Sequence, residues 1–355
     1  MSLDFKPNNM PFRRLGSSGL RVPLFSLGGW LTFGGSVKGD TAKEILRTAF
    51  ENGINMFDVA ESYADGKCET EIGRVLKELG YRRSDLIITT KLFWGTRPGP
   101  NDGGLSRKHI IEGTRECLER LQTDYVDVIF AHRPDHTVPM EEIVRAFNWV
   151  IEKGWAFYWA TSEWSAYEIE EAHNVATRLG LAAPIAEQCR HNMFVRERPE
   201  KEYEPLYRKY DLGTTVFSAL GQGMLTGKYN NGVPSDSRLA VEKDPQHIEL
   251  RAWLESDVGK ARVAKVKQLS EFAEKELGVP VSQLALAWLA IKPATSTIIL
   301  GASKPEQILE NLKALEVIPK LTPAVLEKIE AILENKPEAR PTFGRPELQG
   351  ALPRL

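Results

Sequence analysis

The sequence has few cysteines, and their arrangement excludes a disulfide framework. Its 355 residues include only Cys68, Cys117 and Cys189, which are odd in number and far apart, and no CxxC pair occurs. Small disulfide-stabilised folds need an even set of closely spaced cysteines, and disulfides are rare in reducing compartments. We therefore expect reduced thiols and a cytoplasmic location.

Long apolar segments and an excess of one charge are also absent. The best apolar run, Leu284–Ile291, is much shorter than the roughly 18 residues of a membrane span. The first ten residues carry Asp4 and Lys6 and lack the apolar region of a signal peptide. A net charge of -2 and a pI near 6.4 argue against a clustered basic face. We expect a soluble protein that neither inserts into membranes nor binds nucleic acid.

The sequence does contain a regular alternation of short apolar runs and segments with helical spacing. The apolar runs, interpreted as strands, are Phe25–Gly29, Ile54–Val59, Leu86–Lys91, Val126–Ala131, Ala156–Ser162, Ile185–Gln188, Thr214–Ser218 and Thr297–Leu300. The helical segments are Thr41–Asn52, Glu69–Leu79, Ser106–Leu121, Met140–Lys153, Ala166–Leu179, Pro205–Tyr210, Ala261–Leu277 and Pro305–Leu315. Eight such pairs in a chain of this length predict one (β/α)8 TIM barrel. A doubly wound sheet also fits the alternation, but no GxGxxG follows the first run.

Four further features depart from the simple repeat. A β-hairpin is predicted around Ser17–Gly19, ahead of the barrel. A long loop, Tyr229–Lys260, follows the seventh strand, and an extra helix, Pro323–Leu333, follows the repeat. Residues 337–355 form a proline-rich, irregular tail. We predict a single domain over residues 1–355, with a core of about 12–336.

Ionisable side chains stand where three consecutive predicted strands end. Asp58 ends the second strand with Tyr63 in its loop, Lys91 ends the third, and His132 follows the fourth. Taken singly, Asp58 also fits a turn cap and Tyr63 a packed aromatic. Lys91 also fits a solvated strand end, and His132 a core imidazole. Because the chemistry of a TIM barrel lies at the carboxyl ends of its strands, their joint occurrence favours a shared site.

The four side chains suit proton donation to a carbonyl. An Asp–Lys pair would keep Lys91 protonated, and that cation beside the phenol would lower the pKa of Tyr63 towards neutrality. A neutral His132 could orient the carbonyl oxygen. Such a set serves a carbonyl that receives hydride from elsewhere.

These residues resemble the Asp–Tyr–Lys–His tetrad of the aldo-keto reductases. The likeness runs from Leu15 to about Pro337 and is greatest to the branch that contains the β subunits of voltage-gated potassium channels. It includes the stretches Trp30–Gly35, Thr89–Gly95, Gly104–Gly113, Leu118–Leu121, Arg133–Asp135, Gly227–Tyr229 and Leu300–Ser303. The resemblance implies that NADPH donates hydride to an aldehyde or ketone while Tyr63, assisted by Lys91 and Asp58, acts as general acid.

One departure separates this chain from the channel subunits. Those subunits usually carry Asn where this chain has His132, whereas most catalytic members of the family carry His. The difference favours a working reductase over its alternative, an NADPH-binding, redox-sensing accessory protein of a channel. Relatives of that kind form rings of four, so a homo-tetramer is possible, and a channel partner stays open.

The eighth strand leads into a predicted anion site. Ser303 and Glu306 have the spacing of a capping box, and Pro305 suits a first helical turn, whose N–H groups and dipole attract anions. The resemblance places the 2′-phosphate of NADPH here, near Ser303, Gln307, Glu310 and Asn311, with Lys304 as an added cation.

Further cofactor contacts follow from the resemblance alone. They are Gly29, Trp30, Asp58 and Gly301; Ser162 and Gln188 for the carboxamide; Phe217 stacked on nicotinamide; and a pyrophosphate loop of Ser218, Ala219, Leu220, Gly221, Gln222, Gly223, Lys228 and Arg238. Glu163 and Asp236 depart from the channel subunits, which carry Arg and an aromatic there, and Glu163 brings a negative charge near the cofactor.

The predicted substrate pocket combines aromatic and tetrad residues. It consists of Trp30, Trp94, Tyr63 and His132, with Trp164 as a weaker candidate. A metal-dependent hydrolase built on His132 and Asp135–His136 is disfavoured, because no HxH ends the first strand, and no metal is predicted. The physiological carbonyl substrate stays open.

Overall fold

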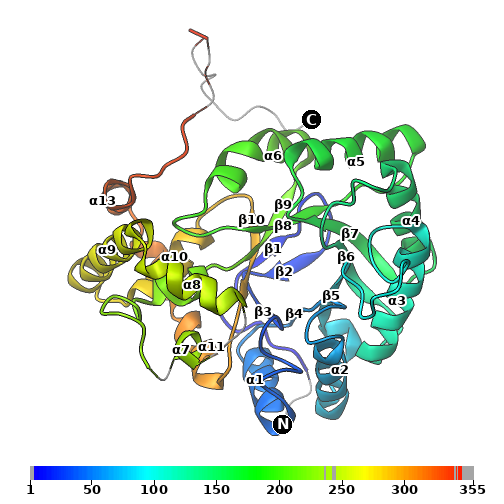
Figure 1. Cartoon of the computed structure of the whole chain (residues 1–355), viewed down its shortest axis with the longest axis horizontal. Coiled ribbons are helices and arrows are strands. Elements are labelled where there is room, and N and C mark those ends of the chain that lie inside the picture. The colour runs from blue at the N-terminus through cyan, green and yellow to red at the C-terminus, as the bar shows by residue number, and fades with distance from the viewer. Residues whose placement is uncertain (1–3, 236, 242–244, 340, 342, 346–355) are drawn as a thin grey trace.

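The computed structural model contains a closed barrel of eight parallel strands (Figure 1), which confirms the predicted TIM barrel. It describes residues 4–235, 237–241, 245–339, 341 and 343–345. The strands are β3 (Phe25–Gly28), β4 (Met56–Asp58), β5 (Ile87–Leu92), β6 (Val126–Ala131), β7 (Ala156–Ser162), β8 (Ala186–Arg190), β9 (Gly213–Phe217) and β10 (Thr295–Leu300). They pair in chain order, and β10 closes the barrel against β3.

Helices form an outer layer around these strands (Figure 1). They are α1 (Gly39–Glu51), α2 (Lys67–Leu79), α3 (Arg107–Leu121), α4 (Met140–Glu152), α5 (Ala166–Leu179), α6 (Glu204–Tyr210), α7 (Arg238–Val241), α8 (Pro245–Glu255), α9 (Asp257–Phe272), α10 (Val281–Ala290), α11 (Pro305–Leu312), α12 (Ala314–Val317) and α13 (Pro323–Leu333). Most bury an apolar stripe against the strands, as amphipathic helices do. The main hydrophobic core lies between the two layers.

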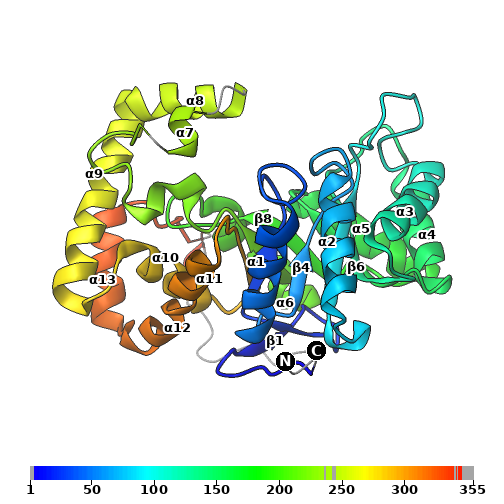
Figure 2. The same ribbon diagram turned by 90° about the horizontal axis from the view of Figure 1, so that it is seen from below.

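An N-terminal hairpin closes one end of the barrel (Figure 2), as the sequence predicts. Its strands are β1 (Phe12–Arg14) and β2 (Arg21–Pro23). Leu15 and Val22 join Met56, Ile87 and further residues of the central strands in a second, fully apolar cluster. This cluster fills the barrel interior on the hairpin side, so polar chemistry is confined to the opposite end.

The prediction of one long loop after the seventh strand is wrong. The segment 229–260 contains α7 and α8 and the beginning of α9, and α8 projects beyond the open end of the barrel (Figure 2). Apolar residues in α8 and α9 follow no clear helical stripe. Without that periodicity, the two helices are not recognisable from the pattern.

The helix predicted over 261–277 is confirmed, but it is not the helix that packs on β10. The sequence pairs the seventh strand with 261–277, but that segment, mostly α9, packs against α13, whereas α10 contacts β10. Every residue of α10 except Ser282 is buried. A helix that is buried on almost all sides shows no amphipathic period, so the sequence of α10 indicates only a short apolar run.

The predicted extra helix is confirmed as α13. Residues 335–339 that follow it are irregular, and most of the predicted tail lies outside the described residues. Cys68, Cys117 and Cys189 are buried free thiols. In the described part of the chain, no helix has both the length and the apolarity to cross a bilayer.

Candidate active site

Interior positions of the barrel strands change from apolar to polar towards the end opposite the hairpin. Successive residues of a strand face opposite sides, so residues two apart share a face. Residues of the second apolar cluster are followed, two or four positions later on the same face of the strand, by polar residues. Met56 is followed by Asp58, Ile87 by Thr89 and Lys91, Phe130 by His132, Ala160 by Ser162, and Ala186 by Gln188. Strand parity therefore brings the predicted site residues together in one layer.

Lys91 lies at the centre of this layer and is fully buried. Its ammonium donates to Asp58 Oδ2 at 2.6 Å, to the Val59 carbonyl at 2.7 Å and to the Tyr63 hydroxyl at 3.1 Å. Burial alone would lower the pKa of Lys91, but the Asp58 carboxylate and Tyr63 outweigh it and raise the pKa. An ammonium has three donors, so the cation is fully satisfied and stays charged.

Asp58 is fixed by more than its ion pair. Its Oδ1 accepts from Thr89 Oγ1 at 2.7 Å and from Gln188 Nε2 at 3.1 Å. The contact from Gln188 links a predicted cofactor residue directly to the tetrad. The role of Thr89 was missed, although its parity, two residues before Lys91, was a usable signal.

The expected lowering of the Tyr63 pKa is wrong. Burial of the phenol raises its pKa, and this effect exceeds the lowering by the Lys91 ammonium. The sequence indicates the neighbouring cation, but it does not show how much solvent the fold removes from the Tyr63 phenol. Tyr63 is therefore protonated at neutral pH, which is the state that a proton donor requires.

His132 completes the set and is neutral. Its ring lies 5.8 Å from that of Tyr63, between centroids. Burial, with the nearby Lys91 and Arg133 cations, lowers the pKa of His132 to about 2. Its Nδ1 is buried without a hydrogen-bond partner. A buried unpaired ring nitrogen is costly, so it is a candidate contact for a ligand.

Two tryptophans are exposed at the predicted substrate site. Trp30 is 40% exposed and Trp94 is 55% exposed, and the Trp94 ring lies 6.5 Å from that of His132. Such large exposed aromatic surfaces suit contact with a ligand. Trp164, in contrast, is fully buried in the main core, so it forms no part of an open aromatic wall.

The strand ends of β7 and β9 carry groups suited to a polar ligand. Ser162 is buried and receives a 3.4 Å hydrogen bond from Arg133. Ser218 follows β9 with φ +56°, a conformation that costs a non-glycine residue free energy, and its Oγ is buried without a partner. The Glu163 carboxylate lies 3.6 Å from Arg198, so its charge is partly compensated.

The predicted pyrophosphate loop begins at Ser218 and folds into a tight turn. Ala219 and Leu220 lead into a kinked 3-10 helix, Gly221–Thr226, with positive φ at Gly221, Gln222 and Gly223. A Cβ on Gly223 would lie 2.7 Å from Lys228 Nζ. The glycine therefore lets the backbone come close to the lysine ammonium. Phe217, at the end of β9, is half-buried beside this turn.

The start of α11 differs in detail from its prediction. The N-cap is Lys304, no side chain caps the helix, and the Ser303–Glu306 capping box is absent. Instead the Ser303 N–H donates to Gln307 Oε1 at 2.7 Å. Pro305 occupies the first turn as predicted. The Lys304 side chain has no oxygen and only its backbone carbonyl accepts, from the Gln307 N–H at 3.2 Å, so the first turn has no side-chain acceptor and fits an anion.

The remaining predicted cofactor residues surround these groups. A Cβ on Gly29 would lie 2.5 Å from Cys68 Sγ, which explains the glycine before Trp30. On α11, Glu310 accepts from Gln283 at 2.7 Å and from Lys313 at 2.9 Å, and Asn311 is buried. Gly301 follows β10 directly. The side chains of Asp236 and Arg238 lie outside the described part of the structure.

Comparison with known proteins agrees with this geometry. A family model described as "Aldo/keto reductase family" matches residues 25–334. The chain belongs to the aldo/keto reductase family. It is 52% identical, over 330 residues, to a "Probable voltage-gated potassium channel subunit beta" of Arabidopsis thaliana, covering 93% of this chain and 98% of the relative. A "Putative voltage-gated potassium channel subunit beta" of Schizosaccharomyces pombe is 52% identical over 335 residues, covering 94% and 96%.

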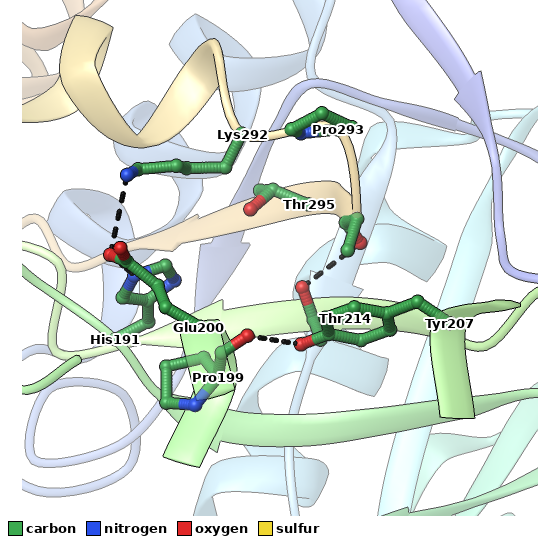
Figure 3. A pocket seen from close by; sticks show the side chains of 9 residues that line it. His191, Pro199, Glu200, Tyr207, Thr214, Lys292, Pro293 and Thr295 are labelled. Atoms are coloured by element: carbon green, nitrogen blue, oxygen red, sulfur yellow. Dashed lines mark hydrogen bonds and ion pairs between the residues drawn. The ribbon is translucent and has the colours of Figure 1, made fainter. Parts of the chain in front are cut away.

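This aldo/keto reductase barrel has a pocket away from the predicted site, near the starts of β9 and β10 (Figure 3). It has a volume of about 220 Å³ and contains no predicted site residue. Its polar groups are paired: Lys292 lies 3.3 Å from Glu200, and the Tyr207 hydroxyl donates to the Pro199 carbonyl at 2.7 Å. Within the described residues, no three His, Cys, Asp or Glu side chains gather as a metal site.

Proposed function

We propose that this protein is an NADPH-dependent reductase that converts aldehydes or ketones to alcohols. The observation that carries the proposal is the bonding of one buried ammonium, Lys91, to both Asp58 and the hydroxyl of Tyr63. That arrangement supports a phenol as proton donor, because the cation stabilises the phenolate left behind. Membership of an oxidoreductase family supports the same class of reaction.

In this mechanism each tetrad residue acts on the carbonyl oxygen or on its neighbour. Tyr63 transfers its proton to the oxygen as the carbon accepts hydride. His132, neutral over the physiological range, positions that oxygen through its ring nitrogen. Asp58 keeps Lys91 charged, and Lys91 offsets the charge that develops on Tyr63.

The chain's own groups fit the cofactor that the family implies. When bound, NADPH would supply the hydride. Ser162 and Gln188 would hold its carboxamide, and Phe217 would stack on its ring. The turn Ser218–Gly223 with Lys228 would hold its pyrophosphate, and the start of α11 its 2′-phosphate. The unpaired Ser218 Oγ and the uncapped helix start are the observations that support this fit.

A panel of aldehydes and ketones tests the proposal directly. Purified protein is mixed with NADPH and each compound, and oxidation of the nucleotide is followed by absorbance. We expect steady turnover with at least some carbonyls, and slower turnover with NADH. Absence of turnover across a broad panel, with NADPH bound, would contradict the proposal.

The names of the relatives support a second candidate function. Both are named as β subunits of voltage-gated potassium channels, at 52% identity. On this alternative the protein binds NADPH tightly and docks on a channel as an accessory subunit. Single-turnover hydride transfer without steady turnover, together with co-purification of a channel, would favour it over the reductase.

A further inference from the structure

Glu61 is a buried acid that lies between Asp58 and Tyr63 in the chain and takes no part in the tetrad. Only 2% of its surface is exposed. Its Oε1 accepts from the backbone N–H groups of Phe93 at 2.7 Å and Gly95 at 2.8 Å, and lies 3.2 Å from His109 Nε2 on α3. A buried carboxylate needs several such partners to be retained.

The backbone explains why Glu61 faces away from Asp58. The Val59 N–H donates to the Thr89 carbonyl at 2.9 Å, and the Glu61 N–H donates to the Lys91 carbonyl at 3.2 Å. These bonds continue the β4–β5 ladder beyond the end of β4. Asp58 and Glu61 are three residues apart along this extended segment, so they face opposite sides. One acid enters the barrel and the other enters the helix layer.

The two N–H groups that Glu61 holds flank Trp94. The Gly95 amide lies in the peptide plane that follows Trp94, and the Phe93 amide lies one peptide before the plane that precedes it, so one carboxylate oxygen holds the backbone on both sides of Trp94 and restricts the direction of its side chain. The loop also closes on itself at this point. The Gly104 N–H donates to the Phe93 carbonyl at 2.6 Å, and Gly95, with φ +69°, packs against the Asp102 carbonyl.

We propose that Glu61 is a positioning residue that holds the Trp94 loop at the edge of the active site. Through it, the segment that carries Asp58 and Tyr63 also fixes the aromatic ring beside His132. The effect on substrate binding rests on the proposed reductase function, whereas the effect on Trp94 itself does not. Loss of the acceptor leaves two backbone N–H groups unsatisfied and releases the loop.

The test uses two substitutions and a matched control. Glu61→Met removes the acceptor at similar length, whereas Glu61→Gln retains a carbonyl oxygen. Glu69→Met removes another buried acid, which bonds Arg120 at 2.7 Å and Thr90 and does not contact the Trp94 loop. Protein labelled with 5-fluorotryptophan is observed by fluorine NMR, and Trp94→Phe assigns the resonance.

We expect the Trp94 resonance to shift or broaden in Glu61→Met and to stay close to wild type in Glu61→Gln and Glu69→Met. For an aromatic aldehyde that the wild-type protein reduces, we expect Glu61→Met to raise the KM about fivefold. The kcat for the same aldehyde should change less than about twofold. The KM for a short aliphatic aldehyde changes less, because it makes less contact with an aromatic wall.

An unchanged Trp94 resonance in Glu61→Met, or the same change in Glu69→Met, would overturn the inference. If Glu61→Met does not fold, hydrogen exchange in the wild-type protein decides instead. The amides of Phe93 and Gly95 should exchange much more slowly than those of Thr96, Arg97 and Asn101, and equal rates would overturn the inference. Neither measurement needs turnover, so a failure of the reductase proposal is recognised separately.

Discussion

Lys91 shows how a single side chain organises the candidate site. A fully buried ammonium is retained only when its donors are satisfied, and here Asp58, the Val59 carbonyl and the Tyr63 hydroxyl take all three. Asp58 is the last residue of β4, and Val59 and Tyr63 lie in the segment that follows it. The position of Tyr63 is therefore set by the same cation that would stabilise its phenolate.

Substitution of Tyr63 by Phe should abolish carbonyl reduction while NADPH binding stays nearly intact. The change removes only the hydroxyl, and general acid catalysis typically contributes about 10²–10⁴-fold. Turnover is measured by NADPH absorbance, and binding by nucleotide fluorescence titration. Retained turnover in Tyr63→Phe would contradict Tyr63 as the proton donor.

His132 should make stability depend on pH below neutrality. Folded His132 stays neutral down to a pKa of about 2, whereas an unfolded histidine binds a proton near pH 6.5. The unfolded state then binds more protons, so the free energy of unfolding decreases as pH falls below about 6.5. Between pH 7 and pH 5 the contribution is about 2 kcal/mol.

Urea unfolding at pH 7 and pH 5 measures this contribution. The loss of unfolding free energy between the two pH values should be smaller in His132→Asn than in wild type. The exposed His136 serves as control, and His136→Asn should leave the loss unchanged. Equal losses in wild type and His132→Asn would show that His132 is not held neutral by burial.

At the scale of elements, the segment from β4 into α2 is bonded to β5 through two of its buried acids. Asp58 accepts from Thr89 and Lys91, and Glu69 accepts from Thr90. Since Thr89 and Thr90 face opposite sides of β5, the segment holds the strand from inside and outside the barrel. This double attachment fixes the loop that carries Tyr63.

The start of α11 should select NADPH over NADH through Lys304. This residue is the N-cap of a helix that begins without a side-chain cap. Lys304→Ala should raise the Kd for NADPH about fivefold and that for NADH less than twofold, because only NADPH has a 2′-phosphate for the cation to contact.

Fluorescence titration with both nucleotides gives the two Kd values. Lys313→Ala is the matched control, since Lys313 lies just after the same helix and bonds to Glu310 at 2.9 Å. NADH that binds wild-type protein as tightly as NADPH would contradict a phosphate site at this helix start.

At the scale of the whole molecule, an ion cluster around the buried Arg196 attaches the last helix to the barrel. Arg196, 3% exposed, bonds Glu200 through Nε at 3.0 Å and Glu330 on α13 through Nη1 at 2.7 Å. It also bonds Asn335, just after that helix, at 3.0 Å. The extra helix is therefore part of the folded barrel and is held by charge as well as by apolar packing.

Arg196→Met should lower the free energy of unfolding by about 3 kcal/mol, because it removes the cation that bonds the half-buried Glu330 carboxylate and one of the two cations beside Glu200. Arg74 on α2, which pairs with Glu71 and Glu78 at the surface, is the control. Arg74→Met should cost less than about 1 kcal/mol. Denaturant unfolding measures both. Equal losses in the two variants would show that the cluster does not hold α13.

Much of the fold was predictable because its signals are local. A buried parallel strand is a short apolar run, and its last residue marks the carboxyl end, so Asp58 and Lys91 could be located without knowing their neighbours. The same argument failed for α10, because a helix that is buried on all sides carries no periodicity.

The sequence by itself determined the barrel, its hairpin and the residues that could meet at the strand ends, since each depends on local pattern or on chain order. Tertiary structure alone decided which groups bond. In the folded chain, Asp58 accepts a hydrogen bond from Thr89, and Glu61 accepts from the amides on either side of Trp94. The capping box expected at Ser303 does not form. It also decided the sign of the Tyr63 pKa shift, because desolvation depends on what the whole fold packs around the phenol.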